Sequence, residues 1–255
     1  MKFKEFIERA LFLLSVPKCV CCGDQLDFED KALCKNCMRD YLDAKTRDCS
    51  RCARVLSRCT CSNFYLAKHG IKKLVKLFRY ETYKDNDPSS YLVYSLKQDN
   101  RRDTFFFTAE ELTAAIRANL QIEGNEERFL ITNVPRRRSK IIEYGYDHAE
   151  VMARRIAENL GIKYFQALCS KSKKSQKETH GRERQENAQF AYKTGKNISL
   201  RGKTVILVDD IVTTGSSLGA CAKLLRALGC RNIIGAALGI AYRDAYTKPQ
   251  PTFTK

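Results

Sequence analysis

The stretch TVILVDDIVTTGSS, residues 204–217, constrains the fold of this chain more than any other segment. Its aliphatic start, 204–208, is typical of a strand buried on both faces of a parallel sheet. Two acids, Asp209 and Asp210, follow at the expected end of that strand. An apolar helical pattern over 218–228 comes next. This order of strand, acids, loop and helix predicts an α/β domain.

The loop after the acids has the composition of a phosphate-binding turn. It consists of Thr213, Thr214, Gly215, Ser216 and Ser217. Backbone N–H groups and hydroxyls converge at such a helix start, where the helix dipole adds positive potential. Neighbouring carboxylates disfavour a phosphate, but they bind sugar hydroxyls or a hard cation such as Mg²⁺. Together the two groups predict a ribose 5-phosphate site; the alternative is a strand-turn-helix whose acids only cap the turn.

This stretch resembles the phosphoribosyl pyrophosphate (PRPP) motif of type I phosphoribosyltransferases over nearly its whole length. The resemblance implies a mostly parallel sheet flanked by helices. It also implies that Asp209 and Asp210 bind the ribose hydroxyls and that Thr213 to Ser217 bind the 5-phosphate, with Mg²⁺ accompanying the PRPP.

Nine of the twelve cysteines lie before residue 62, and eight of them form closely spaced pairs. The pairs are Cys19 with Cys22, Cys34 with Cys37, Cys49 with Cys52, and Cys59 with Cys61. Two neighbouring thiolates reach one metal ion, and two such pairs complete a tetrahedral zinc site. We expect the first two pairs to form one structural zinc site and the last two another. A single zinc with idle cysteines, interleaved pairing, and disulfides of a secreted domain are the alternatives.

Basic residues outnumber acidic ones by 46 to 29, which gives a formal net charge of +17. Such an excess attracts polyanions, PRPP or nucleic acid alike, although a plain basic surface gives the same count. One basic group follows a strand predicted over 129–134, where it would meet a pyrophosphate unless it is only a solvated loop. This group consists of Arg136, Arg137, Arg138 and Lys140. A second group, within 169–190, includes Lys174 and suits a loop that orders on an anion or follows a nucleic-acid backbone.

Further strands and helices are predicted around these motifs. Residues 76–81 alternate as a strand, and 233–241 form an apolar strand before the C-terminal tail. Residues 91–97 read as a short helix whose last residue, Lys97, is expected to lie in solvent.

Two capping boxes predict the starts of longer helices. Thr108 with Glu111 marks the first, and Asp147 with Glu150 marks the second, which Gly161 would end. The second helix follows the basic group, so the two form part of a βα unit with a cationic loop at the end of its strand.

The first 16 residues do not have the features of an export signal. The apolar run over 10–16 is short, follows Glu5, Glu8 and Arg9, and lacks a small-residue cleavage site. We expect an amphipathic packing helix there and no membrane-spanning segment elsewhere. Together with the thiol content, this favours a cytoplasmic protein.

In their order along the chain these features resemble the ComF family, phosphoribosyltransferase-like proteins linked to DNA uptake in natural transformation. The resemblance rests on the cysteine-rich head, Val134 and Pro135 at a strand end, the GYDHA stretch at 145–149, a spaced pattern over 176–190, and the PRPP motif. It implies a zinc-ribbon module with an N-terminal helix over 1–66 and a phosphoribosyltransferase-like domain over 67–255. Tyr144 stands where the family has an arginine, which leaves a pyrophosphate contact at that position unsupported.

Three functions are compatible with this resemblance. In the first, a PRPP-binding protein supports DNA uptake by handling single-stranded DNA in the cytoplasm, beside uptake machinery at the inner membrane. In the second, a Mg²⁺-dependent phosphoribosyltransferase moves ribose 5-phosphate from PRPP to a nitrogenous base for nucleotide salvage. The third is a zinc-dependent interaction module with a relic nucleotide fold. We favour the first, because the chain beyond 241 offers little material for a hood over a base.

Overall fold

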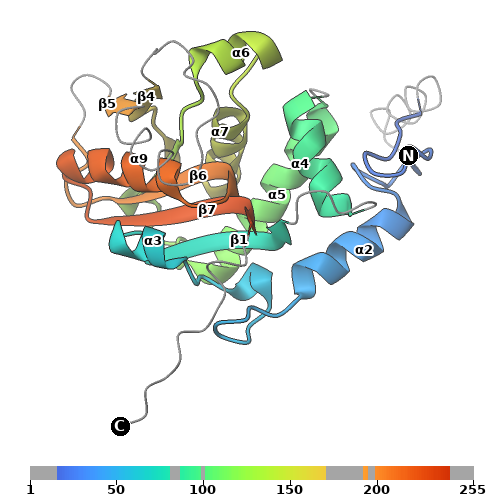
Figure 1. The fold of residues 1–255 in the computed structure, drawn as a ribbon, viewed down its shortest axis with the longest axis horizontal. Helices are drawn as coiled ribbons and strands as arrows, with labels where there is room; N and C mark the ends of the chain where they lie inside the picture. Colours follow the sequence, from blue (N-terminus) through green and yellow to red (C-terminus); the bar gives the residue numbers. More distant parts are fainter. Residues whose placement is uncertain (1–15, 81–86, 99–100, 171–191, 195–198, 242–255) are drawn as a thin grey trace.

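Five parallel strands form the central sheet, in the order β1, β7, β6, β2, β3 (Figure 1). The structure is a computed structural model that describes residues 16–80, 87–98, 101–170, 192–194 and 199–241. The strands are β1 (Lys73–Tyr80), β2 (Phe129–Asn133), β3 (Lys163–Tyr164), β6 (Thr204–Val212) and β7 (Asn232–Ala241).

Apolar side chains project from both faces of this sheet, because successive residues of a strand point to opposite sides. In β1, Val75 packs into one hydrophobic core and Leu74 into the other. In β6, Ile206 and Val205 divide in the same way. A sheet that is apolar on both faces needs a helical layer on each side.

Helices supply these two layers (Figure 1). The helices α2, α4, α5 and α7 contribute to the core on one face, and α3 and α9 contribute to the core on the other. Their bounds are α2 (Lys35–Thr46), α3 (Phe64–Lys68), α4 (Pro88–Gln98), α5 (Arg102–Asn119), α7 (His148–Leu160) and α9 (Ser216–Ala227). The predicted fold class, a mostly parallel sheet flanked by helices, is confirmed.

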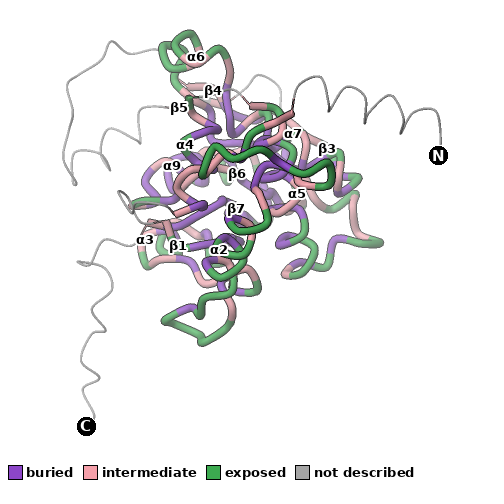
Figure 2. Tube along the Cα trace, turned by 90° about the vertical axis from the view of Figure 1, so that its right-hand side faces the viewer, coloured by how far each residue is buried: buried purple, intermediate pink, exposed green. Residues whose placement is uncertain are grey.

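Smaller elements complete the described chain. An antiparallel pair joins β4 (Leu168–Ser170) to β5 (Tyr192–Thr194). The short turns η1 (Leu56–Arg58) and η2 (Glu126–Arg128) are 3₁₀ helices. The helix α6 (Arg138–Tyr144) has no buried residue, and Figure 2 shows it at the surface.

Two elements are longer than the sequence predicted. The strand expected over 204–208 continues through both acids to Val212, because β6 pairs with β7 as far as Ile240. The helix expected over 91–97 begins at Pro88, a residue whose fixed φ suits a first helical position. The acid pair therefore lies within a strand and not after it.

The predicted cap of the second helix is confirmed in part. The Asp147 side chain accepts hydrogen bonds from the N–H groups of residues 149 and 150, and Gly161 ends α7 with a φ of +67°. The Glu150 carboxylate accepts from Arg154 at 2.9 Å, so the reciprocal half of the capping box is not seen. The other predicted capping box is wrong, because α5 already begins at Arg102. Thr108 lies inside that helix, where its hydroxyl donates to the Thr104 carbonyl at 2.7 Å.

Several predictions fall at least partly outside the described residues: the N-terminal packing helix, the end of the strand predicted over 76–81, the basic segment with Lys174, the pattern over 176–190, and the C-terminal tail. The domain boundary at residue 66 stays a prediction. Among the helices of the described ranges, none combines the length and the apolar character that crossing a bilayer requires.

Candidate functional site

A crevice opens between the carboxyl ends of β2 and β6, where the chain turns to opposite sides of the sheet. After β2 the chain passes through α7 to β3, and after β6 it passes through α9 to β7 on the other side. Ligands of open α/β sheets bind at such switch points. A cavity of about 230 Å³ lies there. Its polar lining is Arg136, Arg137, Lys140, Asp147, His148, Tyr192, Asp209, Asp210 and Ser217.

The two acids of β6 are held by their own strand. An oxygen of Asp209 accepts a hydrogen bond from the Asp210 N–H at 3.0 Å, and Asp210 accepts one from the Ile211 N–H at 2.6 Å. Burial raises the pKa of Asp209 well above its usual 3.8, and the negative charge of Asp210 raises it further. The cavity therefore presents an acid pair whose joint ionisation is disfavoured until a ligand or a cation compensates it.

Lys97 supplies one such cation. Its ammonium lies 3.1 Å from an oxygen of Asp210, and the two side chains retain only 33% and 21% of their exposure. The lysine also lowers the pKa of Asp209, against the larger effect of burial. The expectation that Lys97 ends its helix in solvent is wrong. No local pattern pointed to this contact, because it joins α4 to a strand far along the chain.

The loop before α9 is seated on α3. The Thr214 and Ser216 hydroxyl oxygens lie 2.6 Å apart, and the Thr214 carbonyl accepts a hydrogen bond from the Asn63 amide at 3.3 Å. Gly215 has a φ of +83°, and a Cβ there would lie 2.8 Å from the Leu66 side chain. Glycine is thus required both by the backbone conformation and by the close approach of α3. The loop places the first turn of α9 at the edge of the crevice, where the Ser216 N–H donates to the Thr214 hydroxyl oxygen at 3.3 Å.

The opposite wall of the cavity is cationic, and Arg136 is its most constrained member. Its backbone N–H donates to Asp147 at 2.7 Å. Its guanidinium lies 3.2 Å from Nε2 of His148 and 4.8 Å from the centre of the Tyr144 ring. His148 itself is buried, and Tyr146 packs edge-on against it. Arg136 is therefore oriented before any ligand binds.

Asp147 joins the parts of this wall. One oxygen caps α7, and the other accepts from Arg136 and, at 3.4 Å, from the Asn133 amide at the end of β2. Burial raises the pKa of Asp147, against the hydrogen bonds that it accepts. The sequence predicted the capping role of Asp147 but not its place in the site.

Half of the twelve residues predicted to contact the ligand line the cavity. They are Arg136, Arg137, Lys140, Asp209, Asp210 and Ser217. Residues 213–216 form the adjoining loop without lining this cavity, Arg138 is exposed in α6, and Lys174 lies outside the described residues. Lys97, His148 and Tyr192 were not predicted as site residues.

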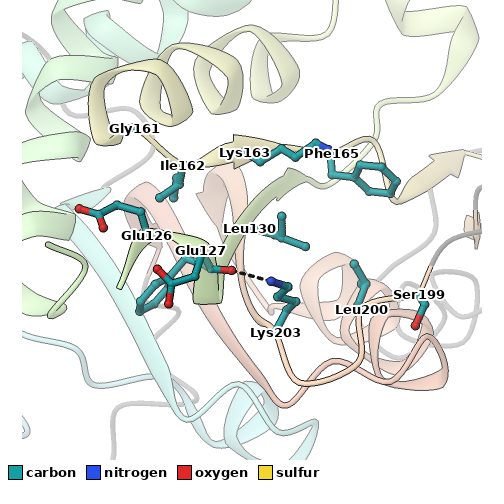
Figure 3. A pocket seen from close by; sticks show the side chains of 11 residues that line it. Glu126, Glu127, Leu130, Gly161, Ile162, Lys163, Phe165, Ser199, Leu200 and Lys203 are labelled. Carbon is teal, nitrogen blue, oxygen red and sulfur yellow. Dashed lines mark hydrogen bonds between the residues drawn. The ribbon is translucent and has the colours of Figure 1, made fainter. Parts of the chain in front are cut away.

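A larger cavity, about 620 Å³, lies at the opposite edge, where β2, β3 and β6 begin (Figure 3). Its walls mix apolar and charged side chains. Leu130, Ile162 and Leu200 face inward, and the Lys203 ammonium donates to the Glu127 carbonyl at 2.6 Å. This edge carries neither the acid pair nor the loop before α9. The smaller cavity at the carboxyl ends is therefore the candidate ligand site, in accord with the general rule for parallel sheets.

The eight paired cysteines gather into two groups of four. One contains Cys19, Cys22, Cys34 and Cys37, and the other contains Cys49, Cys52, Cys59 and Cys61. Within each group the sulfur atoms all lie within 4.8 Å of one another. The grouping is sequential rather than interleaved, and all twelve cysteines are free thiols.

The backbone around these groups suits thiolates that share a metal ion. The residues after Cys22 and Cys52, Gly23 and Ala53, have φ of +79° and +54° and complete matching tight turns. Backbone N–H groups donate to two of the sulfurs, Cys19 and Cys59, each at 3.3 Å. Four thiols at this separation cannot all ionise alone, because their charges repel. A tetrahedral Zn²⁺ would compensate them and supply the structural cross-link of a zinc ribbon.

The chain is similar to known proteins, both in its C-terminal part and along most of its length. Residues 147–253 match the phosphoribosyl transferase domain family. The chain is 25% identical to competence protein F of Haemophilus influenzae over 222 residues, which cover 85% of this chain and 93% of that protein. It is 33% identical to a ribose-phosphate pyrophosphokinase of Saccharolobus solfataricus over 86 residues, 34% of this chain and 25% of that enzyme.

Among solved structures, a purine phosphoribosyltransferase of Pyrococcus horikoshii matches with a TM-score of 0.33 and 19% identity, covering 57% of this chain and 77% of that one. An adenine phosphoribosyltransferase of Thermoanaerobacter pseudethanolicus matches with a TM-score of 0.36 and 18% identity, covering 60% and 85%. The domain match, the parallel sheet and its helical layers confirm the predicted type I phosphoribosyltransferase fold.

Replacing Asp209 by Asn is expected to stabilise the unliganded protein. A carboxyl whose pKa is higher in the folded than in the unfolded state costs stability once the pH exceeds the unfolded value, so the ionised Asp209 is destabilising at pH 7. Asn keeps an oxygen for the Asp210 N–H. We expect a gain of about 0.5–2 kcal/mol at pH 7 that fades towards about pH 4, measured by thermal and urea unfolding.

The matched control is Asp210→Asn, which leaves Lys97 without its carboxylate and should give no gain. An equal gain in both variants, or a gain that persists in acid, would contradict the assigned origin of the effect.

Gly215→Ala is expected to destabilise the protein by at least about 1 kcal/mol, because alanine is strained at this φ and its Cβ would meet Leu66. Gly202→Ala has a similar φ, +76°, but nothing within 4 Å, so it isolates the conformational part of the cost. Urea midpoints of both variants measure the difference. Equal midpoints would show that α3 does not press on the loop.

Proposed function

We propose that this ComF-like protein, whose phosphoribosyl transferase domain spans residues 147–253, binds PRPP in the crevice between β2 and β6. One observation carries the proposal. A single cavity at the switch point has an acid pair on one side, three cationic side chains on the other, and the start of α9 beside it. A sugar with a phosphate at one end and a pyrophosphate at the other needs these three environments at once.

Each part of the site has a role in this proposal. Asp209 and Asp210 accept hydrogen bonds from the ribose hydroxyls, since ionised carboxylates are strong acceptors. The loop of residues 213–217 and the N-terminus of α9 bind the 5-phosphate. Arg136, with Arg137 and Lys140, faces the pyrophosphate, where Mg²⁺ would share its charge.

Binding of the sugar also changes the partner of Asp210. Its contact with Lys97 occupies one carboxylate oxygen at 3.1 Å, so the ribose hydroxyls must share or displace that ammonium. Lys97 thus compensates the acid pair in the unliganded protein, and the ribose hydroxyls or Mg²⁺ compensate it in the complex.

We also propose that the protein supports DNA uptake by handling single-stranded DNA in the cytoplasm, next to uptake machinery at the inner membrane. The similarity to competence protein F along most of the chain motivates this role. The net charge of +17 supplies the attraction to a phosphate backbone. Arg136 and Lys140 flank the Tyr144 ring at 4.8 and 5.3 Å, which places cations beside a surface on which a base could stack.

An active phosphoribosyltransferase is the second candidate. The observation in its favour is the restraint of Arg136 by Asp147, His148 and Tyr144. A guanidinium that is already oriented would stabilise the charge of a departing pyrophosphate without further reorganisation.

Addition of PRPP and Mg²⁺ is expected to raise the melting temperature of the wild-type protein. A ligand at 100 times its dissociation constant contributes about 2.7 kcal/mol. The double variant Asp209→Asn, Asp210→Asn should lose this shift, whereas Glu126→Gln, at the larger cavity, should keep it. Unchanged stabilisation in the double variant would disprove the role of the acids.

The same titration with isotopically labelled PRPP and a panel of bases separates the two candidates. A stabilised complex without product supports a binding protein. Steady release of pyrophosphate together with labelled nucleotide would replace that proposal by the enzymatic one.

Arg136→Glu is expected to weaken binding of a fluorescent single-stranded oligonucleotide and to reduce the slope of log affinity against log salt by about 1. Arg128→Glu makes the same charge change on an exposed residue at the opposite edge and should have a smaller effect. Fluorescence anisotropy at several salt concentrations measures both variants. Absence of binding by the wild-type protein at low salt would remove the nucleic-acid role.

A further inference from the structure

A fully buried lysine of the central sheet lies against the second cysteine group. Lys76, in the middle of β1, has 0% relative exposure. Its ammonium donates to the carbonyls of Cys61 at 3.0 Å and Cys59 at 3.3 Å, and it lies 3.3 Å from the Cys59 sulfur. The Leu74 carbonyl is a fourth, longer contact at 3.5 Å.

No carboxylate among the residues that the structure describes balances the charge of this ammonium. The hydrogen-bond partners of Lys76 within that part of the chain are carbonyls and one sulfur. Burying an ammonium without a counter-charge is costly, so lysine is almost never fully buried unless it is paired. Four neutral thiols would not compensate it.

A metal–thiolate centre would compensate it. Four thiolates around one divalent ion carry a net charge of −2, and this group offers four thiols within 4.8 Å of one another. We propose that Lys76 is the charge partner of such a centre at Cys49, Cys52, Cys59 and Cys61, and that it positions Cys59 as a ligand. The lysine offsets half of the negative charge and donates a hydrogen bond to one coordinating sulfur, as outer partners of metal ligands commonly do.

The first cysteine group lacks this arrangement and serves as an internal reference. Its four thiols have a similar mix of buried and exposed positions. Its Cys19 sulfur accepts a hydrogen bond from the Cys34 N–H at 3.3 Å, and the Cys22 and Cys34 sulfurs lie 3.6 Å apart, but no described lysine donates to the sulfurs of this group. The two centres should therefore differ in their dependence on a lysine, although their ligands are alike.

The contact also ties the second centre to the ligand-binding domain. β1 is an edge strand of the sheet, and the segment around Cys61 pairs with its start at Lys73. The Leu74 N–H donates to the Thr60 carbonyl at 2.9 Å. The metal–thiolate centre thus holds a segment that pairs with the start of the edge strand, where unpaired backbone groups would otherwise be open to unwanted pairing.

Lys76→Met tests the proposal in the full-length protein loaded with zinc or cobalt. We expect one of the two metal ions to bind about 10- to 100-fold more weakly in a chelator competition, the range typical of lost outer partners of metal ligands. The other ion should be held as in the wild type. In the cobalt protein, the thiolate-to-metal absorption should fall by about half at chelator concentrations that leave the wild type loaded. Lys73→Met, an exposed lysine of the same strand, should change neither measurement.

A double-mutant comparison separates charge pairing from simple packing. In a Cys52→Ser, Cys61→Ser background the centre cannot form, so Lys76 becomes a buried cation without a partner. Lys76→Met should then raise the melting temperature, whereas in the wild-type background it should lower it. A loss of stability in both backgrounds would overturn the proposal, and so would unchanged metal affinity in Lys76→Met. The comparison also decides the matter if the single variant fails to fold, and none of its readouts depends on PRPP.

Discussion

The candidate site depends on two adjacent carboxylates kept inside a buried parallel strand. Burial opposes the ionisation of Asp209, and the neighbouring Asp210 opposes it further. The surrounding structure reduces this cost in separate ways. Backbone N–H groups of β6 donate to both carboxylates, Lys97 reaches Asp210 from α4, and the acids lie at the carboxyl edge of the sheet rather than in its middle. A site of this kind lowers the stability of the unliganded protein, but it lets the carboxylates accept hydrogen bonds from a polyhydroxylated ligand.

The cationic wall of the cavity depends on a different constraint, which is that Arg136 is held in one orientation. Asp147 caps α7 and accepts hydrogen bonds from the Arg136 N–H and from the Asn133 amide at the end of β2, so one carboxylate positions a strand end, the start of the cationic wall and a helix. His148 and Tyr144 then limit the guanidinium from its sides. Tyr144 stands where the ComF family has arginine, yet it still contributes to the wall by packing against Arg136 and Lys140. The similarity to competence protein F over 85% of the chain confirms the resemblance to that family.

Buried or half-buried lysines connect the distant parts of the molecule. Lys97 links α4 to the acid pair, and Lys76 links the central sheet to the second cysteine group. The segment after that group leads directly into α3, which seats the loop before α9 through Asn63 and Leu66. The cysteine-rich region and the candidate ligand site therefore share one continuous path of contacts.

Local patterns determined much of this protein. Short apolar runs predicted β2, β6 and β7, the capping pattern at Asp147 predicted the start of α7, and cysteine spacing indicated two groups of four thiols. Each of these signals lies within a few residues of the chain, and the acids and the loop of the site came from one such segment. The tertiary structure alone decided the ion pair of Lys97, the burial of Lys76, the true start of α5 and the extension of β6 beyond its acids. The physical reason is that these features depend on strand pairing, burial and charge compensation between residues remote in sequence. A pattern within a few residues carries no information on the energies of such contacts.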